Sequence, residues 1–328
     1  MNEEDGRTRG RVVLGGSTGF IGQDLQRRWR AAGREVVTVS RHGADLTWDD
    51  QAGIDAAVDG ASLVVGLAGK SVNCRYTAAN RAEILRSREQ TTAALRIAVR
   101  NAVTPPPLWI NSSTATIYRH AEDRPQTEST GELGTGFSVE VAKAWERELF
   151  AGDLPRTRRV ALRTAIVLGD GGVLGTLRRL ARCGLGGTQH DGPWPIGRAR
   201  RAAGTAHYFR ARGGLQRFSW VHLDDLAGII AFLEEHPELE GPVNAVAPQA
   251  SDNRTLMATI RRALGMRVGL PSARWMLELG AVALRTETEL ILKSRWVAPD
   301  KLLDAGYAFR HPALDEAVRA SFALTPAP

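Results

Sequence analysis

The sequence contains little cysteine, tyrosine or lysine, and it has no long apolar run. Only two of its 328 residues are cysteines, Cys74 and Cys183, so a disulfide framework is excluded and a reducing compartment is expected. No apolar stretch approaches the roughly 20 residues that a membrane-spanning helix needs. The charged start MNEEDGRTRGR does not resemble a signal peptide. We therefore expect a cytoplasmic protein with no membrane partner.

The net charge of +7 is concentrated in one segment. Residues 190–217 contain six arginines and one acid, Asp191, which is a net +5. A uniformly basic chain would be typical of nucleic-acid binding, so we do not expect a nucleic acid as partner. Two interpretations of this arginine-rich loop remain open. Its arginines can close over an anionic substrate as phosphate ligands, or they can form a solvated insertion.

Short β-branched runs alternate with amphipathic stretches in the N-terminal half. Strands are expected at 11–15, 35–40, 63–67, 108–112 and 159–168, and helices at 22–32, 78–99 and 139–150. Strands that are separated by helices pair in parallel, and right-handed crossovers then cover both faces of the sheet. The predicted fold class is α/β, with a Rossmann-like doubly wound parallel sheet.

The pattern changes after residue 170. A long Gly- and Arg-rich loop is followed by a strand at 218–222, a helix at 226–235 and a strand at 243–246. Helices are then expected at 254–264, 274–284, 299–305 and 314–322. We predict that residues 1–170, joined by 216–250, form the sheet domain. Residues 171–215 and 251–328 would form a smaller, mostly helical substrate lobe. No metal site is expected, because His and Cys residues lack compact ligand spacing.

The strongest local motif is the segment VVLGGSTGFIG at residues 12–22, where a strand runs through a glycine-rich turn into a helix. Gly16 allows the tight turn, Gly19 allows the backbone to approach a pyrophosphate, and Gly22 lets the helix pack closely on the sheet. The helix N-terminus offers unpaired N–H groups to the phosphates. The predicted dinucleotide-binding residues are Gly16, Ser17, Thr18, Gly19, Phe20, Ile21 and Gly22.

The end of the second predicted strand indicates which dinucleotide binds. NAD-binding sites usually carry Asp or Glu here, to bond the ribose 2′-hydroxyl. This chain has Ser40 and Arg41 instead. A hydroxyl followed by a guanidinium suits a 2′-phosphate, which predicts NADP(H) as the cofactor. The alternative is that Arg41 is a solvated loop residue.

Several further segments complete a recognisable pattern. They are GGSTGFIG (15–22), LAGKSV (67–72), ILRSREQTT (84–92), LRTAIVLG (162–169), GLGG (184–187), FSWVHLDDL (218–226), NAVAPQ (244–249) and APDKLLDAGYAFRHPALDEAV (298–318). Together they resemble the extended short-chain dehydrogenase/reductase superfamily, in its NAD(P)-dependent epimerase/dehydratase branch. They are most similar to the atypical epimerase family proteins that carry a small C-terminal domain of unknown function. The resemblance implies that these residues lie beside the cofactor: Leu67, Ala68, Gly69, Thr164, Ala165 and Ile166.

Redox members of that superfamily use a Ser or Thr, a Tyr and a Lys, with the Tyr four residues before the Lys. The resemblance places Thr114 and Lys143 in two of these roles, but Val139 occupies the tyrosine position. No tyrosine of this chain precedes a lysine by four residues. Tyr118, Glu140 and His222 remain alternatives as the acid/base. A further alternative is that the protein has no catalytic activity.

The predicted function is an NAD(P)-dependent oxidoreductase or epimerase, of the extended short-chain dehydrogenase type. Its substrate is expected to be a small polar molecule, anionic or nucleotide-linked. Thr114 would orient this substrate, and Lys143 would hold the nicotinamide ribose. The alternative is a non-catalytic NADP(H)-binding regulator or sensor. Whether the chain forms a homodimer is left open.

Overall fold

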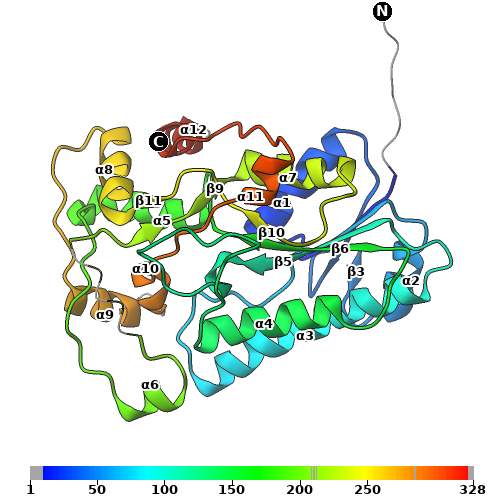
Figure 1. Ribbon diagram of the computed structural model, residues 1–328, viewed down its shortest axis with the longest axis horizontal. Coiled ribbons are helices and arrows are strands. Elements are labelled where there is room, and N and C mark those ends of the chain that lie inside the picture. The colour runs from blue at the N-terminus through cyan, green and yellow to red at the C-terminus, as the bar shows by residue number, and fades with distance from the viewer. Residues whose placement is uncertain (1–9, 208, 210, 212, 284–285, 324–328) are drawn as a thin grey trace, which may run out of the picture.

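The structure, a computed structural model, describes residues 10–323 except 208, 210, 212, 284 and 285. Its centre is a seven-stranded sheet with the strand order β10-β6-β5-β4-β1-β2-β3 (Figure 1). The strands are β1 (Val12–Gly15), β2 (Val36–Ser40), β3 (Leu46–Thr47), β4 (Leu63–Gly66), β5 (Leu108–Thr114), β6 (Arg158–Thr164) and β10 (Gly241–Ala245). All neighbouring pairs are parallel. The prediction of a doubly wound α/β fold is confirmed.

The winding direction of the sheet reverses at β1. The chain first moves outward from β1 through β2 to β3, and it then returns to place β4 on the other side of β1. Because the strands are parallel, their carboxyl ends meet at one edge. Ligands of such sheets bind beyond that edge, at the strands where the order reverses. The topology therefore points to the ends of β1 and β4.

Helices cover both faces of the sheet (Figure 1). On one face lie α1 (Phe20–Ala31) and α7 (Leu223–Glu235), and on the other lie α2 (Gln51–Val58), α3 (Ala78–Asn101) and α4 (Phe137–Phe150). Successive strand residues point to opposite faces. Val12 and Leu14 therefore pack with α1 and α7, whereas Val13 packs with α2 and α3.

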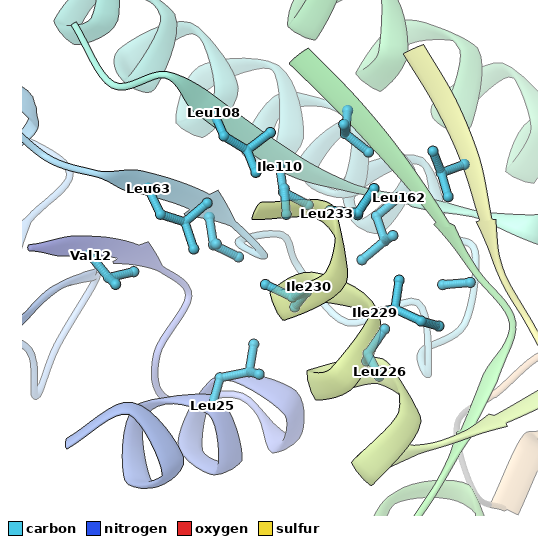
Figure 2. Packing of buried hydrophobic residues seen from close by; sticks show 14 of the residues in the cluster. Val12, Leu25, Leu63, Leu108, Ile110, Leu162, Leu226, Ile229, Ile230 and Leu233 are labelled. Atoms are coloured by element: carbon cyan, nitrogen blue, oxygen red, sulfur yellow. The ribbon is translucent and has the colours of Figure 1, made fainter. Parts of the chain in front are cut away.

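The packing on the α1 and α7 face is dense and aliphatic. Figure 2 shows Leu25 of α1 and Ile229 and Ile230 of α7 lying against Leu63 and Ile110 of the sheet. All five side chains are 0–1% exposed. Full burial of such a side chain contributes roughly 1.5–3 kcal/mol. This face supplies a rigid base for the loops at the carboxyl edge.

The second half of the chain is mostly helical, and much of it lies beside that edge. Two small sheets join it, one pairing β7 (Ile166–Leu168) with β9 (Trp220–His222) and one pairing β8 (Arg217–Phe218) with β11 (Ser251–Asp252). The helices are α5 (Gly172–Leu180), a π-helical turn (Ala181–Leu185), α6 (Arg198–Ala202), α8 (Asn253–Ala263), α9 (Arg274–Ala283), α10 (Glu289–Leu292), α11 (Asp300–Asp304) and α12 (Leu314–Ala323). The predicted helical C-terminal part is confirmed. The exact domain boundaries stay a prediction.

The structure departs from the predicted elements in several places. The strand expected at 159–168 breaks at Ala165, because the chain leaves β6 there and β7 pairs with β9 instead. Helix α2 was missed because it is only eight residues long; the Asp50 carboxylate accepts a hydrogen bond from the Gly53 N–H and caps it. The loop at 190–217 contains the short helix α6.

No helix in the described part of the chain combines the length and apolar composition needed to cross a bilayer.

Candidate functional site

The glycine-rich turn after β1 is shaped by close backbone contacts. Gly16 has a φ of +85°, and a Cβ at this position would lie 2.8 Å from the backbone nitrogen of Ala68. A Cβ on Gly22 would lie 2.3 Å from the carbonyl oxygen of Gly16. Neither position has room for a side chain. The turn and the first residues of α1 are thereby held against the end of β4.

Gly19 differs from its two neighbours in the motif. A Cβ at this position would make only an ordinary contact, at 3.5 Å from the Gly16 carbonyl oxygen. Gly19 is exposed and is the N-cap of α1, but no side chain caps the helix and no acid occupies its first turn. The first N–H groups and the positive end of the helix dipole therefore face an open approach. These features fit a bound pyrophosphate.

The end of β2 carries hydroxyl and guanidinium groups. The Oγ1 of Thr18 lies 3.2 Å from the Oγ of the buried Ser40, and Arg41 follows with an exposed side chain. The carboxylate of Asp45 accepts hydrogen bonds from the N–H and hydroxyl of Thr38, at 2.9 and 2.7 Å. These bonds are the largest cause of a lowered pKa at Asp45. Asp45, the acid closest to Arg41 in the sequence, is therefore held by hydrogen bonds within the β2–β3 loop.

The other predicted cofactor segments lie at the same edge of the sheet. Leu67, which follows β4, donates its N–H to the Gly15 carbonyl at 2.8 Å. A Cβ on the exposed Gly69 would lie 3.0 Å from the guanidinium carbon of Arg88 on α3. The half-buried residues 164–166 form the break between β6 and β7.

Thr114 and Lys143 both lie next to the turn that follows β5. Thr114 ends β5 directly opposite Thr164 of β6, and its Oγ1 accepts the N–H of Thr116 at 3.1 Å. Helix α4, which carries Lys143, packs on this turn. The Nζ of Lys143 donates to the Gly134 carbonyl at 3.1 Å and to the Glu140 carboxylate at 3.0 Å. Glu140 itself is exposed.

Val139 has no hydroxyl group, and the hydroxyl of Tyr118 is not exposed at this edge of the sheet. Val139 is completely buried in α4. Tyr118 is 2% exposed; its hydroxyl donates to the Oδ1 of Asn244 at 3.0 Å and accepts from Arg163 at 2.8 Å. Burial is the largest cause of a raised pKa at Tyr118. Both hydrogen bonds hold the tyrosine inside the protein, which favours a structural role.

His222 is also committed to the interior. It is 1% exposed, its Nδ1 accepts the backbone N–H of Asp224 at 3.2 Å, and burial lowers its pKa to about 4. His222, Asp224 and His311 bring potential metal-ligand atoms within 4.8 Å of one another. However, the guanidinium of Arg28 already bonds the Asp224 carboxylate. An internal cation thus neutralises the carboxylate on which a metal would depend.

The arginine-rich loop is largely tied to α9 and the residues that follow it. Arg200 donates to Glu287 at 2.8 Å and to Glu278 at 3.2 Å, and Arg274 of α9 bonds Asp191 of the loop at 2.6 Å. Arg210 and Arg212 lie outside the described residues. These ion pairs make Arg200 a structural link between the loop and the lobe.

Two cations that the sequence analysis did not single out lie beside the Thr114 turn. Lys293 donates to the carbonyl of Thr116 at 2.8 Å, and Arg295 donates to its hydroxyl at 3.2 Å. Both side chains are buried. They follow Thr116 by 177 and 179 residues, so no local motif connects them. The only available signal was that Lys293 is one of four lysines in the chain.

The doubly wound sheet with its glycine-rich turn defines the class of Rossmann-like α/β proteins. Residues 12–145 match the model of the NAD dependent epimerase/dehydratase family, and residues 273–321 match a domain of unknown function, DUF1731. The chain is 34% identical over 323 residues to the epimerase family protein SDR39U1 of Bos taurus, covering 94% of this chain and 98% of that protein. It is 26% identical to the epimerase family protein YfhF of Bacillus subtilis, covering 94% and 96%.

This chain belongs to the NAD-dependent epimerase/dehydratase family, as the resemblance predicted. A crystal structure of human epimerase family protein SDR39U1 with NADPH matches it with a TM-score of 0.80 and 30% identity, covering 95% of this chain and 98% of that one. UDP-glucose 4-epimerase of Thermus thermophilus in complex with NAD has a TM-score of 0.69 and 17% identity, covering 95% and 97%. The second likeness shows a shared fold.

Proposed function

We propose that this protein binds NADP(H) beyond the carboxyl ends of β1, β2 and β4. The open, uncapped first turn of α1 behind Gly19 carries this proposal, because it offers N–H groups and a dipole to a pyrophosphate. Ser40 and Arg41 would hold the 2′-phosphate. The match to human SDR39U1, which was crystallised with NADPH, supports the same choice of cofactor.

The predicted site residues take the following roles in this proposal. The turn residues Gly16, Ser17, Thr18, Gly19, Phe20, Ile21 and Gly22 surround the pyrophosphate. Leu67, Ala68 and Gly69 pass beside the cofactor, and Thr164, Ala165 and Ile166 line the nicotinamide end. Lys143 holds the nicotinamide ribose.

We further propose that the protein is an oxidoreductase or epimerase for a small polar substrate. Bound NADP(H) would supply or accept a hydride. Thr114 would orient the substrate, because it ends β5 directly opposite Thr164, beside the break between β6 and β7. No residue is assigned as the acid/base. Tyr118 could act in this role only after its hydroxyl has lost its hydrogen bonds to Arg163 and Asn244.

A specific observation favours the second candidate, a non-catalytic NADP(H)-binding regulator. The position four residues before Lys143 is filled by Val139, which is fully buried and has no group that can transfer a proton. Such a protein would use the bound cofactor as a signal. It would bind NADPH with no hydride transfer to any substrate.

The decisive experiment is calorimetric titration with NADPH, NADP⁺, NADH and NAD⁺. Arg41→Ala should weaken NADPH binding tenfold or more and leave NADH binding unchanged, since a hydrogen bond to a charged group contributes about 1.5–3 kcal/mol. Arg86→Ala is the matched control, because Arg86 is an exposed arginine that pairs with Glu83 on α3. An equal loss for both cofactors would remove Arg41 from the 2′-phosphate site. No binding of any dinucleotide would overturn both candidate functions.

A further inference from the structure

Among the residues that the structure describes, Lys293 and Arg295 are buried cations that form no ion pair with a carboxylate. Their residues are 4% and 7% exposed. Besides the hydrogen bonds to Thr116, Arg295 donates to the Leu290 carbonyl at 2.9 Å, so every partner is an uncharged oxygen. Among the described residues neither cation forms an ion pair within 4 Å, although the charge of Glu289 favours the charged form of both. The nearby Glu289 carboxylate accepts from Ser138 instead.

Three of the four other buried arginines among the described residues pair with a carboxylate. Arg34 pairs with Glu234 at 2.9 Å, and Arg163 pairs with Glu146 at 2.7 Å. Arg88, which lacks a carboxylate, has its guanidinium carbon 4.8 Å from the centre of the Trp145 ring. Burying an unpaired charge costs several kcal/mol, and two adjacent cations also repel each other. Lys293 and Arg295 lie close together without an ion pair among the described residues; the carboxylate of Glu289, whose charge favours the charged form of both, pairs with neither.

A small pocket of about 60 Å³ opens beside these cations. Ile166, which is predicted to contact the nicotinamide, lines one side of it, and Arg217 adds a third positive charge. The guanidinium carbon of Arg217 lies 4.4 Å from the centre of the Trp296 ring. None of the described residues that line the pocket is acidic. Its size admits a group as small as a carboxylate, with the rest of the ligand extending outward.

We propose that Lys293 and Arg295 form the receptor for a carboxylate group of the substrate. This proposal rests on the proposed function, because it places the anion between the Thr114 turn and the nicotinamide end of the cofactor site. It names the substrate class as a small carboxylic acid. It also gives a role to the segment matched by the domain of unknown function, since both cations lie within residues 273–321.

The titration of Lys293 is consistent with a missing anion. Burial lowers the pKa of Lys293 to about 8, with the charge of Arg295 acting in the same direction and that of Glu289 opposing it. A bound carboxylate would favour the ammonium form and raise this pKa again. At a pH near or above this pKa, we therefore expect binding of the anion to be accompanied by uptake of a proton.

The test is calorimetric titration of the full chain with malonate, with malonamide as the uncharged match and inorganic phosphate as a different oxyanion. Malonate should bind, and malonamide should not. Lys293→Met and Arg295→Met should each weaken malonate binding tenfold or more. Lys301→Met is the matched control, because Lys301 also donates to a backbone carbonyl, that of Glu240 at 2.7 Å, and does not line this pocket. Failure of malonate to bind, or equal binding by all four proteins, would overturn the proposal.

A second measurement on the unmodified protein guards against variants that fail to fold. At pH 8.5, titrations in two buffers of different ionisation enthalpy should reveal uptake of a fraction of a proton with malonate. The Lys293→Arg variant, which retains the positive charge, should still bind malonate. Binding without proton uptake would place the anion elsewhere, and preference for phosphate would overturn the carboxylate class. The same samples are also titrated with NADPH. If NADPH does not bind, the proposed cofactor is contradicted, whereas the result with malonate still decides the proposed carboxylate site.

Discussion

The guanidinium of Arg163 donates a hydrogen bond to the hydroxyl oxygen of Tyr118 at 2.8 Å. The same guanidinium is held by the carboxylate of Glu146, and the tyrosine hydroxyl donates to Asn244 at 3.0 Å. Four side chains from separate elements are thereby joined under the carboxyl edge of the sheet. Buried polar networks with satisfied partners select one arrangement of the elements that carry them. This network gives Tyr118 a structural task that does not involve proton transfer.

Tyr118→Phe should therefore reduce stability and leave cofactor binding intact. The substitution removes the hydroxyl that pairs with Arg163 and Asn244, and each unpaired buried polar group costs about 1–3 kcal/mol. Urea unfolding should show a loss in this range, with an unchanged NADPH dissociation constant. Tyr307→Phe is a useful comparison, because its hydroxyl donates to the Asp225 carbonyl at 3.0 Å away from the network. Unchanged stability of Tyr118→Phe would contradict the structural role.

Gly22→Ala should disrupt the cofactor turn, although alanine is the better helix former. The added Cβ would lie 2.3 Å from the Gly16 carbonyl oxygen, and backbone cannot move aside cheaply. We expect a loss of about 1–3 kcal/mol in the free energy of unfolding and weaker NADPH binding. The control is Gly175→Ala in α5, where a Cβ meets nothing within 4 Å. That substitution should raise the free energy of unfolding by up to about 1 kcal/mol. If Gly22→Ala and Gly175→Ala changed the free energy of unfolding equally, this would contradict the close packing at Gly22.

Acidification should destabilise the protein through His222. Its pKa is about 4 in the folded state because of burial, and about 6.5 in the unfolded chain. Between these values the unfolded state binds a proton that the folded state does not. The free energy of unfolding therefore falls as the pH drops from 6.5 to 4, by on the order of 3 kcal/mol in total.

His222→Asn tests this dependence. Asparagine can accept the Asp224 N–H and keep the cap of α7, but it does not titrate. Urea unfolding across pH 7 to 4 should show the smaller decline in the variant. His120 and His207, whose pKa values burial also lowers, are present in both proteins and cancel in the difference. Parallel stability curves would show that His222 does not contribute.

Glu278→Ala should release the arginine-rich loop without changing the cofactor site. Glu278 accepts hydrogen bonds from Arg274 at 2.7 Å, from Thr288 at 2.9 Å and from Arg200 at 3.2 Å. Removing this carboxylate takes one of two acidic partners from Arg200 and from Arg274, which keep Glu287 and Asp191. The hydrogen bonds that are lost should cost about 1–3 kcal/mol. Hydrogen exchange in residues 198–207 should accelerate, whereas NADPH binding should not change. The control is Glu83→Ala, which removes only the outer pair with Arg86. Unaltered exchange would mean that other contacts hold the loop.

The sequence by itself determined the fold class and the cofactor turn. Both are encoded locally: β-branched runs that alternate with helices dictate parallel pairing, and the spacing of Gly16, Gly19 and Gly22 fits only a tight turn into a helix. The missing tyrosine was equally visible, because Val139 stands at a fixed distance from Lys143.

Only the tertiary structure decided what the polar side chains of the second half do. Whether Tyr118 is an acid or a structural partner depends on Arg163 and Asn244, which are 45 and 126 residues away. Lys293 and Arg295 reach the Thr114 turn from even farther along the chain. A charge acquires its chemistry from its burial and its neighbours, and these exist only after distant segments have packed together.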